Sequence, residues 1–207
     1  KNGKQTRELR RRYVKQDEKV ILHAGTPKDR RNQRFINYET IDEYIDGLTS
    51  LIMAVEGINN IHLIIRYRPL DGLEIDELTR ILPKSKSYSI ASDLTFIDYL
   101  SITDLLVSYS SSTMEEALQN NIPVLLFNKY NRYQHIRGRE LAPESGDILP
   151  SAVYNVNSKE NLKFAIQWIF QNHLPQRDSL INLFDEYKYR TNEMVSIPKF
   201  IEETVGA

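Results

Sequence analysis

Cysteine is absent from the 207-residue chain. Without thiols the chain has no disulfide, no thiolate zinc site and no cysteine nucleophile. This composition fits a reducing compartment, so we expect a cytoplasmic protein whose membrane association, if any, arises through the full-length protein. No apolar run approaches the roughly 20 residues that span a bilayer, and no secretory signal pattern is present.

A strong excess of charge of either sign is also missing. The chain has 27 lysines and arginines against 28 aspartates and glutamates, a formal net charge of −1. We therefore expect no nucleic-acid partner. The charge is less even in residues 1–19, where eight side chains are basic and three are acidic. We interpret residues 1–19 as a charged helix or linker that leans on another part of the full-length protein, and residues 20–207 as one domain.

Short apolar runs alternate with amphipathic stretches along the rest of the chain. The runs that predict buried strands are 20–24, 61–67, 87–90, 104–109 and 122–127. The stretches that predict helices are 38–55, 75–82, 94–102, 114–119, 158–170 and 179–195. This alternation indicates an α/β, Rossmann-like fold with a parallel sheet and helices on both faces. Residues 128–150 lack periodicity and predict a long loop.

Ligands of open parallel sheets bind beyond the carboxyl ends of the strands, so the loops there hold the candidate site. The first such loop begins Gly25-Thr26-Pro27 and continues with Lys28, Arg30 and Arg31. Glycine allows a backbone to approach a ligand closely, and the cations suit an anion. A plain glycine turn with solvated charges is the alternative.

Two arginines follow the second predicted strand. Arg66 and Arg68 stand in the sequence Arg66-Tyr67-Arg68-Pro69, directly where that strand ends. Guanidinium groups at this position suit a phosphate or carboxylate ligand. An ion pair on the protein surface is the alternative interpretation.

Four consecutive hydroxyl residues form the third candidate loop. Ser110, Ser111, Ser112 and Thr113 lie between a predicted strand and a helix that continues Met-Glu-Glu-Ala. Free N–H groups and the helix dipole suit phosphate at such a helix start. Serine and threonine before two glutamates are also a capping signature. Four hydroxyls exceed what capping needs, so the pattern favours phosphate binding.

The segment 104–127, DLLVSYSSSTMEEALQNNIPVLLF, resembles the donor-site motif of GT-B glycosyltransferases. That motif has a strand, a Ser/Thr phosphate turn, a Glu-Ala helix and a Pro-Val strand. The variant with several serines is similar to bacterial surface and capsular polysaccharide transferases, including CDP-glycerol glycerophosphotransferase-like and sialyltransferase-like enzymes. The resemblance extends over residues 20–127 and more weakly to residue 170. It implies that the chain is one half of a GT-B fold, the C-terminal nucleotide-sugar-binding domain.

The resemblance implies roles for individual residues. Residues 110–113 would hold the donor phosphates, and Glu116 would accept hydrogen bonds from the ribose hydroxyls, unless it is simply an exposed helix carboxylate. The loop 89–94 would lie against the nucleobase. The pair Arg66 and Arg68 replaces a His-Pro pair of related transferases, which disfavours a CMP-sugar donor. Residues near the donor sugar would be Asn131, Tyr133, Gln134 and His135, with loop packing as the alternative.

The function implied is the donor-binding domain of a glycosyltransferase of surface polysaccharide or glycan synthesis, with a nucleotide-activated sugar as substrate. We expect no cofactor and no metal, since a DxD motif is absent and the four histidines are scattered. The acceptor and its general base would come from an N-terminal domain of the same protein, so the isolated chain should bind a nucleotide without transferring sugar.

Three other functions stay open. A UDP-N-acetylglucosamine 2-epimerase shares this fold, although it typically has more histidine and acidic residues at the strand ends. A non-catalytic nucleotide- or protein-binding module is the second alternative. The third, a flavodoxin-like regulatory domain, would need clustered acidic residues and a lysine at the strand ends.

Overall fold

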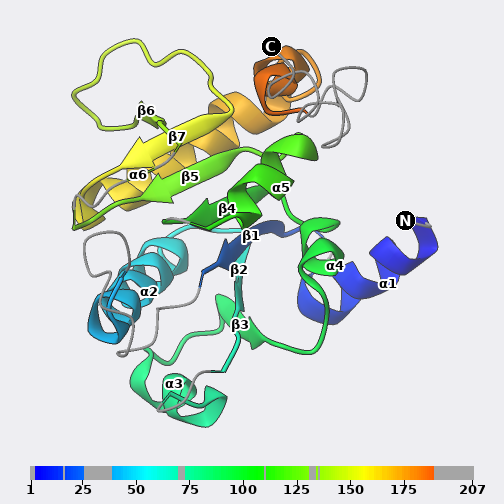
Figure 1. Ribbon diagram of the computed structural model, residues 1–207, viewed down its shortest axis with the longest axis vertical. Coiled ribbons are helices and arrows are strands. Elements are labelled where there is room, and N and C mark those ends of the chain that lie inside the picture. Colours follow the sequence, from blue (N-terminus) through cyan, green and yellow to red (C-terminus); the bar gives the residue numbers. More distant parts are fainter. Residues whose placement is uncertain are drawn as a thin grey trace, which may run out of the picture.

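The computed structural model describes residues 3–15, 17–25, 39–69, 73–109, 111–130, 134 and 136–188. Seven strands form one sheet in the order β3-β2-β1-β4-β5-β7-β6, and each pairing is parallel (Figure 1). The strands are β1 Lys19–Ala24, β2 Ile61–Arg66, β3 Tyr88–Ala91, β4 Leu105–Ser108, β5 Val124–Phe127, β6 Arg139–Glu140 and β7 Val153–Val156. This arrangement confirms the α/β, Rossmann-like fold expected from the sequence.

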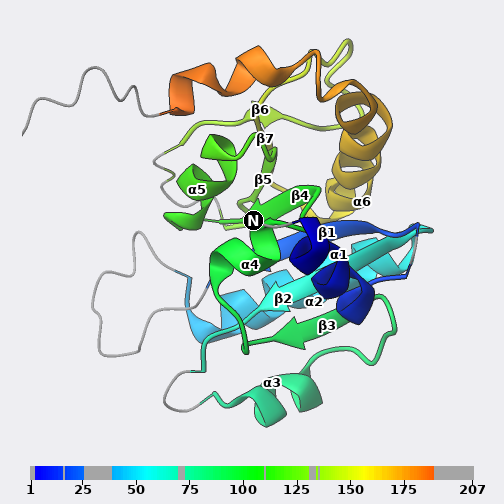
Figure 2. The same cartoon turned by 90° about the vertical axis from the view of Figure 1, so that its right-hand side faces the viewer.

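Helices cover both faces of the sheet (Figures 1 and 2). They are α1 Gly3–Tyr13, α2 Ile41–Glu56, α3 Ile75–Ile81, α4 Phe96–Leu100, α5 Thr113–Gln119 and α6 Lys159–Trp168. A π-helical turn, Ile169–His173, and two 3₁₀ segments, Leu174–Gln176 and η3 Ile181–Tyr187, follow α6. Helices α2, α3 and α6 pack on one face, and α1, α4, α5 and η3 pack on the other. None of the described helices is long and apolar enough to cross a membrane.

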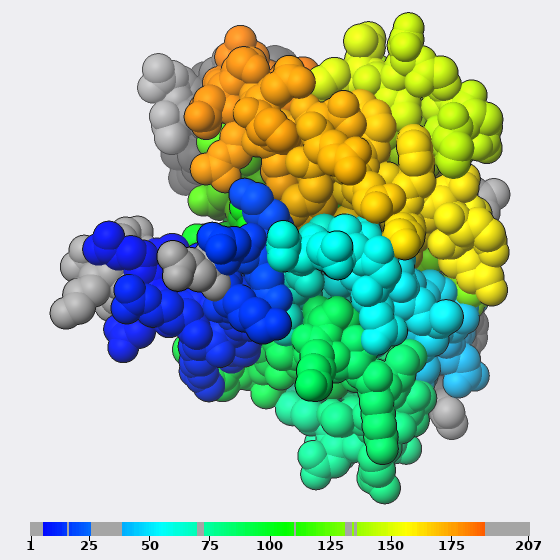
Figure 3. Space-filling view, turned by 180° about the vertical axis from the view of Figure 1, so that it is seen from behind, coloured from blue at the N-terminus to red at the C-terminus, as the bar shows by residue number. Residues whose placement is uncertain are grey.

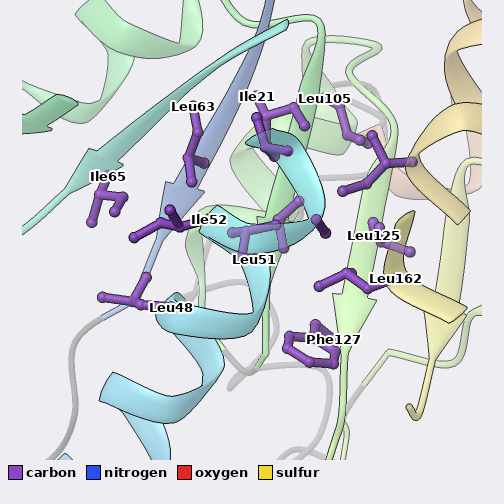
Figure 4. Packing of buried hydrophobic residues seen from close by; sticks show 14 of the residues in the cluster. Ile21, Leu48, Leu51, Ile52, Leu63, Ile65, Leu105, Leu125, Phe127 and Leu162 are labelled. Carbon is purple, nitrogen blue, oxygen red and sulfur yellow. The ribbon is translucent and has the colours of Figure 1, made fainter. Parts of the chain in front are cut away.

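The two cores form because successive strand residues point to opposite faces. In β1, Ile21 joins the core under α2 and α6, whereas Val20 and Leu22 join the core under α4 and α5. Figure 4 shows the first core, in which side chains from α2 and α6 meet those of the strands. Both faces of the central strands are therefore buried, as the near-continuous apolar runs in the sequence indicate.

Helix α2 shows how local sequence fixes an element beside the site. Thr40 accepts a hydrogen bond from the Glu43 N–H at 3.2 Å, and the Glu43 carboxylate accepts one from the Thr40 N–H at 2.9 Å. This capping box starts the helix at the carboxyl edge of the sheet. Helix α2 then buries residues at helical spacing against the strands, namely Tyr44, Leu48, Leu51, Ile52 and Val55.

Helix α1 packs on this domain rather than away from it. Leu9, Tyr13 and Val14 join the core under α4 and α5, and an Arg10 guanidinium nitrogen, Nη1, donates to the Ile102 carbonyl at 3.2 Å. In the space-filling view, α1 projects from the side of the molecule in blue (Figure 3). The helix expected at the start of the chain is therefore present within residues 3–13.

The structure differs from the sequence-based expectations after residue 127. Strand β7 was not predicted, and the predicted loop 128–150 contains the two-residue strand β6. Both residues of β6 are exposed, and only their pairing with β7 defines the strand, so no apolar pattern marks it. Within the described part of the predicted helix 179–195, residues 181–187 are helical, and the helix is of the 3₁₀ type.

Candidate functional site

The predicted loops meet at the point where the strand order reverses. The chain runs outward from β1 through β2 to β3 on one side, and from β4 to β5 on the other. Adjacent strands β1 and β4 therefore send their loops in opposite directions. Open α/β sheets bind their ligands in a crevice at such a switch point, which here lies at the carboxyl ends of β1 and β4. The Ser108 hydroxyl donates to the Ala24 carbonyl at 2.8 Å and joins the two strand ends.

Gly25 forms one side of this crevice. Its carbonyl accepts a hydrogen bond from the Tyr44 hydroxyl at 3.3 Å. A Cβ added at Gly25 would lie 3.7 Å from the His23 ring, an ordinary contact, so the packing of the described residues does not require glycine here. Thr26 and the basic residues after it lie outside the described residues.

The His23 ring of β1 lies close to Gly25. Its ring packs 5.7 Å from the ring of Tyr44. Burial lowers the pKa of His23 to about 4, so the imidazole is neutral at physiological pH. Its Nδ1 is buried and has no hydrogen-bond partner among the described residues.

Arg66 ends β2 and lies beside the crevice, half-buried. Its guanidinium carbon, Cζ, lies 5.7 Å from the centre of the Phe96 ring. The Arg66 Nε is buried without a hydrogen-bond partner, and no carboxylate of the described chain lies within ion-pair distance of the side chain. Partial burial, and to a lesser extent the charge of Arg68, lower the pKa of Arg66. Arg66 is therefore a partly desolvated cation without an ion-pair partner among the described residues.

Arg68 is exposed two residues further on. Its charge acts on Arg66, so the two cations lie near each other. The alternative of a surface ion pair does not hold for the described carboxylates, because none lies within ion-pair distance of either arginine. The two arginines together make this strand end electropositive.

Residues 110–113, which we call the hydroxyl turn, follow β4 on the other side of the switch point. The Thr113 N–H and hydroxyl donate to the Ser111 Oγ at 3.3 and 2.9 Å. Ser112 precedes α5 with helical backbone angles of −58° and −15°, and its side chain makes no capping hydrogen bond. A capping residue is usually extended and bonds the next turn. Ser112 therefore does not cap α5 through its side chain, whereas the Ser111 Oγ accepts the N–H of Thr113, the first residue of the helix. Ser110 lies outside the described residues.

Glu116 and Gln134 take different places relative to this crevice. Glu116 is an exposed residue of α5, near enough to Arg66 to raise the pKa of the guanidinium slightly against its overall lowering. The Gln134 amide donates to the Asn155 side chain of β7 at 3.4 Å. Because β5 separates β7 from β4, Gln134 belongs to the outer part of the sheet. The neighbouring candidates Asn131, Tyr133 and His135 lie outside the described residues.

A contact missed by the sequence analysis fixes the loop after β5. The Asp46 carboxylate of α2 accepts hydrogen bonds from the Lys129 ammonium and the Tyr130 hydroxyl. These hydrogen bonds lower the pKa of Asp46. Asp46 lies 83 residues from Lys129 in sequence, so no local pattern could have shown the pair.

Among the described residues no group of histidines and carboxylates could hold a metal ion. A cavity of about 430 Å³ lies between α4, the end of α5 and η3, where its lining includes Thr103 and Ile122. These residues precede β4 and β5, so this cavity opens at the amino edge of the sheet. A second cavity, of about 600 Å³, lies between α1 and α4.

No protein-family model matches the chain, and no curated protein matches it in sequence. Solved structures do match it in fold. The UDP-GlcNAc 2-epimerase of Neisseria meningitidis, solved with UDP-GlcNAc, superposes with a TM-score of 0.56 at 16% identity, over 98% of this chain and 48% of its own.

Two transferases match to a similar degree. The wall teichoic acid polymerase TagF gives a TM-score of 0.52 at 15% identity, over 99% of this chain and 47% of its own. The spinosyn rhamnosyltransferase SpnG gives 0.56 at 14% identity, over 94% and 46%. The fold is that of one half of the GT-B proteins. The chain spans about half the length of these structures, and transferases and epimerases share its fold equally.

Proposed function

We propose that residues 20–207 are the donor-binding domain of a glycosyltransferase and that residues 1–19 are a charged helix or linker that precedes this domain. The enzyme would transfer a sugar or sugar-like unit from a nucleotide donor in cytoplasmic synthesis of a surface polysaccharide or glycan. One observation supports this most: the Arg66 guanidinium, which has no ion-pair partner among the described carboxylates, ends β2 beside the switch point between β1 and β4. An anion is the ligand that such a cation lacks.

The mechanism of this half is to hold the nucleotide and to stabilise the leaving diphosphate. Arg66 and Arg68 supply positive charge where negative charge develops as the glycosidic bond to phosphate breaks. The hydroxyls and N–H groups of residues 111–113 add donors on the other side of the crevice. Glu116 would accept hydrogen bonds from the ribose hydroxyls, and Gly25, Thr26 and Gln134 would line the donor further out.

The acceptor and its general base belong, in this proposal, to an N-terminal domain of the full-length protein. The isolated chain then binds nucleotide and transfers no sugar. The matched epimerase was solved with a UDP-sugar, so epimerisation is the alternative that shares the same binding step. Incubation of the full-length protein with UDP-GlcNAc, followed by analysis of the sugar, separates the two activities.

Calorimetric titration of the chain with UDP, CDP, CMP, GDP and ADP tests the proposal. We expect saturable binding of one nucleotide, weakened at least about tenfold when Ser111 and Ser112 are both changed to alanine, because a hydrogen bond to a charged phosphate contributes about 1.5–3 kcal/mol. The control, Ser179→Ala, removes a hydroxyl far along the chain, beside η3. Binding that tolerates alanine at Ser111, Ser112 and Thr113 together would refute the phosphate role of the turn.

A further inference from the structure

One acidic side chain in the loop after β3 joins two helices. The Asp93 carboxylate accepts hydrogen bonds from the Tyr13 hydroxyl, at 2.9 Å, and from the Tyr99 hydroxyl. It also pairs with the Arg12 guanidinium at 2.7 Å. Arg12 and Tyr13 belong to α1 and Tyr99 to α4, which lie side by side in Figure 2. Asp93 therefore fastens both helices to the loop at the carboxyl edge of the sheet.

Tyr99 carries this contact into the core. The whole residue is buried, and its ring meets the Tyr13 ring edge-on at 5.6 Å. A buried phenol needs a hydrogen-bond partner, and the Tyr99 hydroxyl finds one in Asp93, with the Tyr13 hydroxyl 3.2 Å away. Burial and the hydrogen bond to Asp93 raise the pKa of Tyr99, which keeps it a neutral donor.

Helix α4 connects this network to Arg66. The helix has five residues, too few to hold its orientation alone, so its anchors set where its side chains lie. Phe96 precedes Tyr99 by one helical turn, and its ring supports the Arg66 guanidinium at 5.7 Å. A shift of Tyr99 therefore moves the surface on which Arg66 rests.

The same network explains why Asp93 is not an ion-pair partner of Arg66. Three donors already occupy the Asp93 carboxylate, so this acid does not neutralise the arginine at the neighbouring strand end. Arg66 and the last residue of β3, Ala91, are partners in the sheet register. Asp93 thus pairs with Arg12 of α1 rather than with Arg66, although the loop that contains Asp93 follows the strand beside Arg66.

We propose that Asp93 is a positioning residue for the phosphate-binding guanidinium of Arg66, acting through Tyr99 and Phe96. This inference rests on the proposed function. It implies that α1 and the phosphate site are coupled, because the Arg12 and Tyr13 side chains of α1 end on the same carboxylate. Asp93 itself would touch no ligand phosphate.

The test compares a nucleoside diphosphate with its nucleoside. The tightest-binding member of UDP, CDP, GDP and ADP and the matching nucleoside are titrated into the chain and into Asp93→Asn and Tyr99→Phe. We expect the diphosphate Kd to rise about fivefold in both variants, within the range of coupling between residues in one network. The nucleoside Kd should stay unchanged in Tyr99→Phe, because Tyr99 lies outside the loop 89–94 that the resemblance sets against the nucleobase. The control, Asp178→Asn, removes the same charge from a fully exposed site.

A double-mutant cycle with Arg66→Ala tests whether Asp93 affects diphosphate binding through Arg66. If Asp93 acts through Arg66, Asp93→Asn has no further effect on diphosphate binding once Arg66 is alanine. Fully additive losses, or equal losses for diphosphate and nucleoside in Tyr99→Phe, would overturn the inference and leave the proposed function standing. If Arg66→Ala alone leaves diphosphate binding unchanged, the phosphate role of Arg66 in the proposed function fails.

Discussion

Replacing Arg66 with alanine should weaken the binding of a nucleoside diphosphate without lowering the free energy of unfolding. The guanidinium is half-buried, its Nε has no partner among the described residues, and no described carboxylate pairs with it. Removing a buried, unsatisfied polar atom relieves a cost of about 1–3 kcal/mol, whereas the lost contact with Phe96 is worth about 0.5–1 kcal/mol. We therefore expect the free energy of unfolding to stay the same or rise by up to about 2.5 kcal/mol.

Ligand affinity should change in the opposite direction. A charge-assisted hydrogen bond to phosphate contributes about 1.5–3 kcal/mol, so the Kd for the nucleoside diphosphate should rise roughly 10- to 150-fold. Urea unfolding measures the stability, and calorimetric titration measures the affinity. The control Arg177→Ala removes an exposed arginine at the amino edge of the sheet and should change neither.

Two results would refute this reasoning about Arg66. A variant destabilised by more than about 1 kcal/mol with unchanged affinity would show that the guanidinium serves the fold rather than a ligand. A variant that loses nucleoside and diphosphate binding equally would show that Arg66 shapes the crevice without contacting phosphate. Either result removes the main support for the proposed function.

Three further predictions follow from other groups. Because burial lowers the pKa of His23 to about 4 from an unfolded value of 6.5, the unfolded state binds more protons below pH 6.5. Stability should thus fall by about 2 kcal/mol between pH 7 and pH 5 on account of this histidine, and His23→Phe should reduce the drop in urea unfolding at the two pH values. Asp46→Ala should release the loop after β5, and trypsin should then cleave after Lys129 several times faster; unchanged cleavage would argue against the anchor. Glu116→Gln should weaken a nucleotide about threefold but leave its 2′,3′-dideoxy analogue unaffected, and equal weakening of both would exclude a ribose contact.

The sheet was predictable because its central strands are buried on both faces. Leu105, Leu106 and Val107 are all buried, and such runs stand out in the sequence without any knowledge of their neighbours. Strand β6 could not be predicted, since two exposed charged residues become a strand only by pairing with β7. Local patterns therefore give the centre of this fold, and its edge depends on tertiary pairing.

The candidate site was predictable only in part for a similar reason. Strand-end position alone identified Arg66 and the hydroxyl turn, because parallel strands bring their carboxyl ends to one edge. The partners of these groups could not be predicted. Asp93 is 80 residues from Tyr13 in sequence, and its contacts exist only after α1 packs beside α4.

The pairing of charges at the carboxyl edge argues for an anion as the missing ligand. Asp93 is occupied by Arg12 and two tyrosines, and Asp46 is occupied by Lys129 and Tyr130. Both acids are thus satisfied by other groups, while Arg66 has no ion-pair partner among the described carboxylates. A partly desolvated cation without an ion-pair partner costs free energy, so this arrangement fits a site whose counter-charge comes with the ligand. A neutral ligand would leave this cost uncompensated, and a nucleoside diphosphate would offset it.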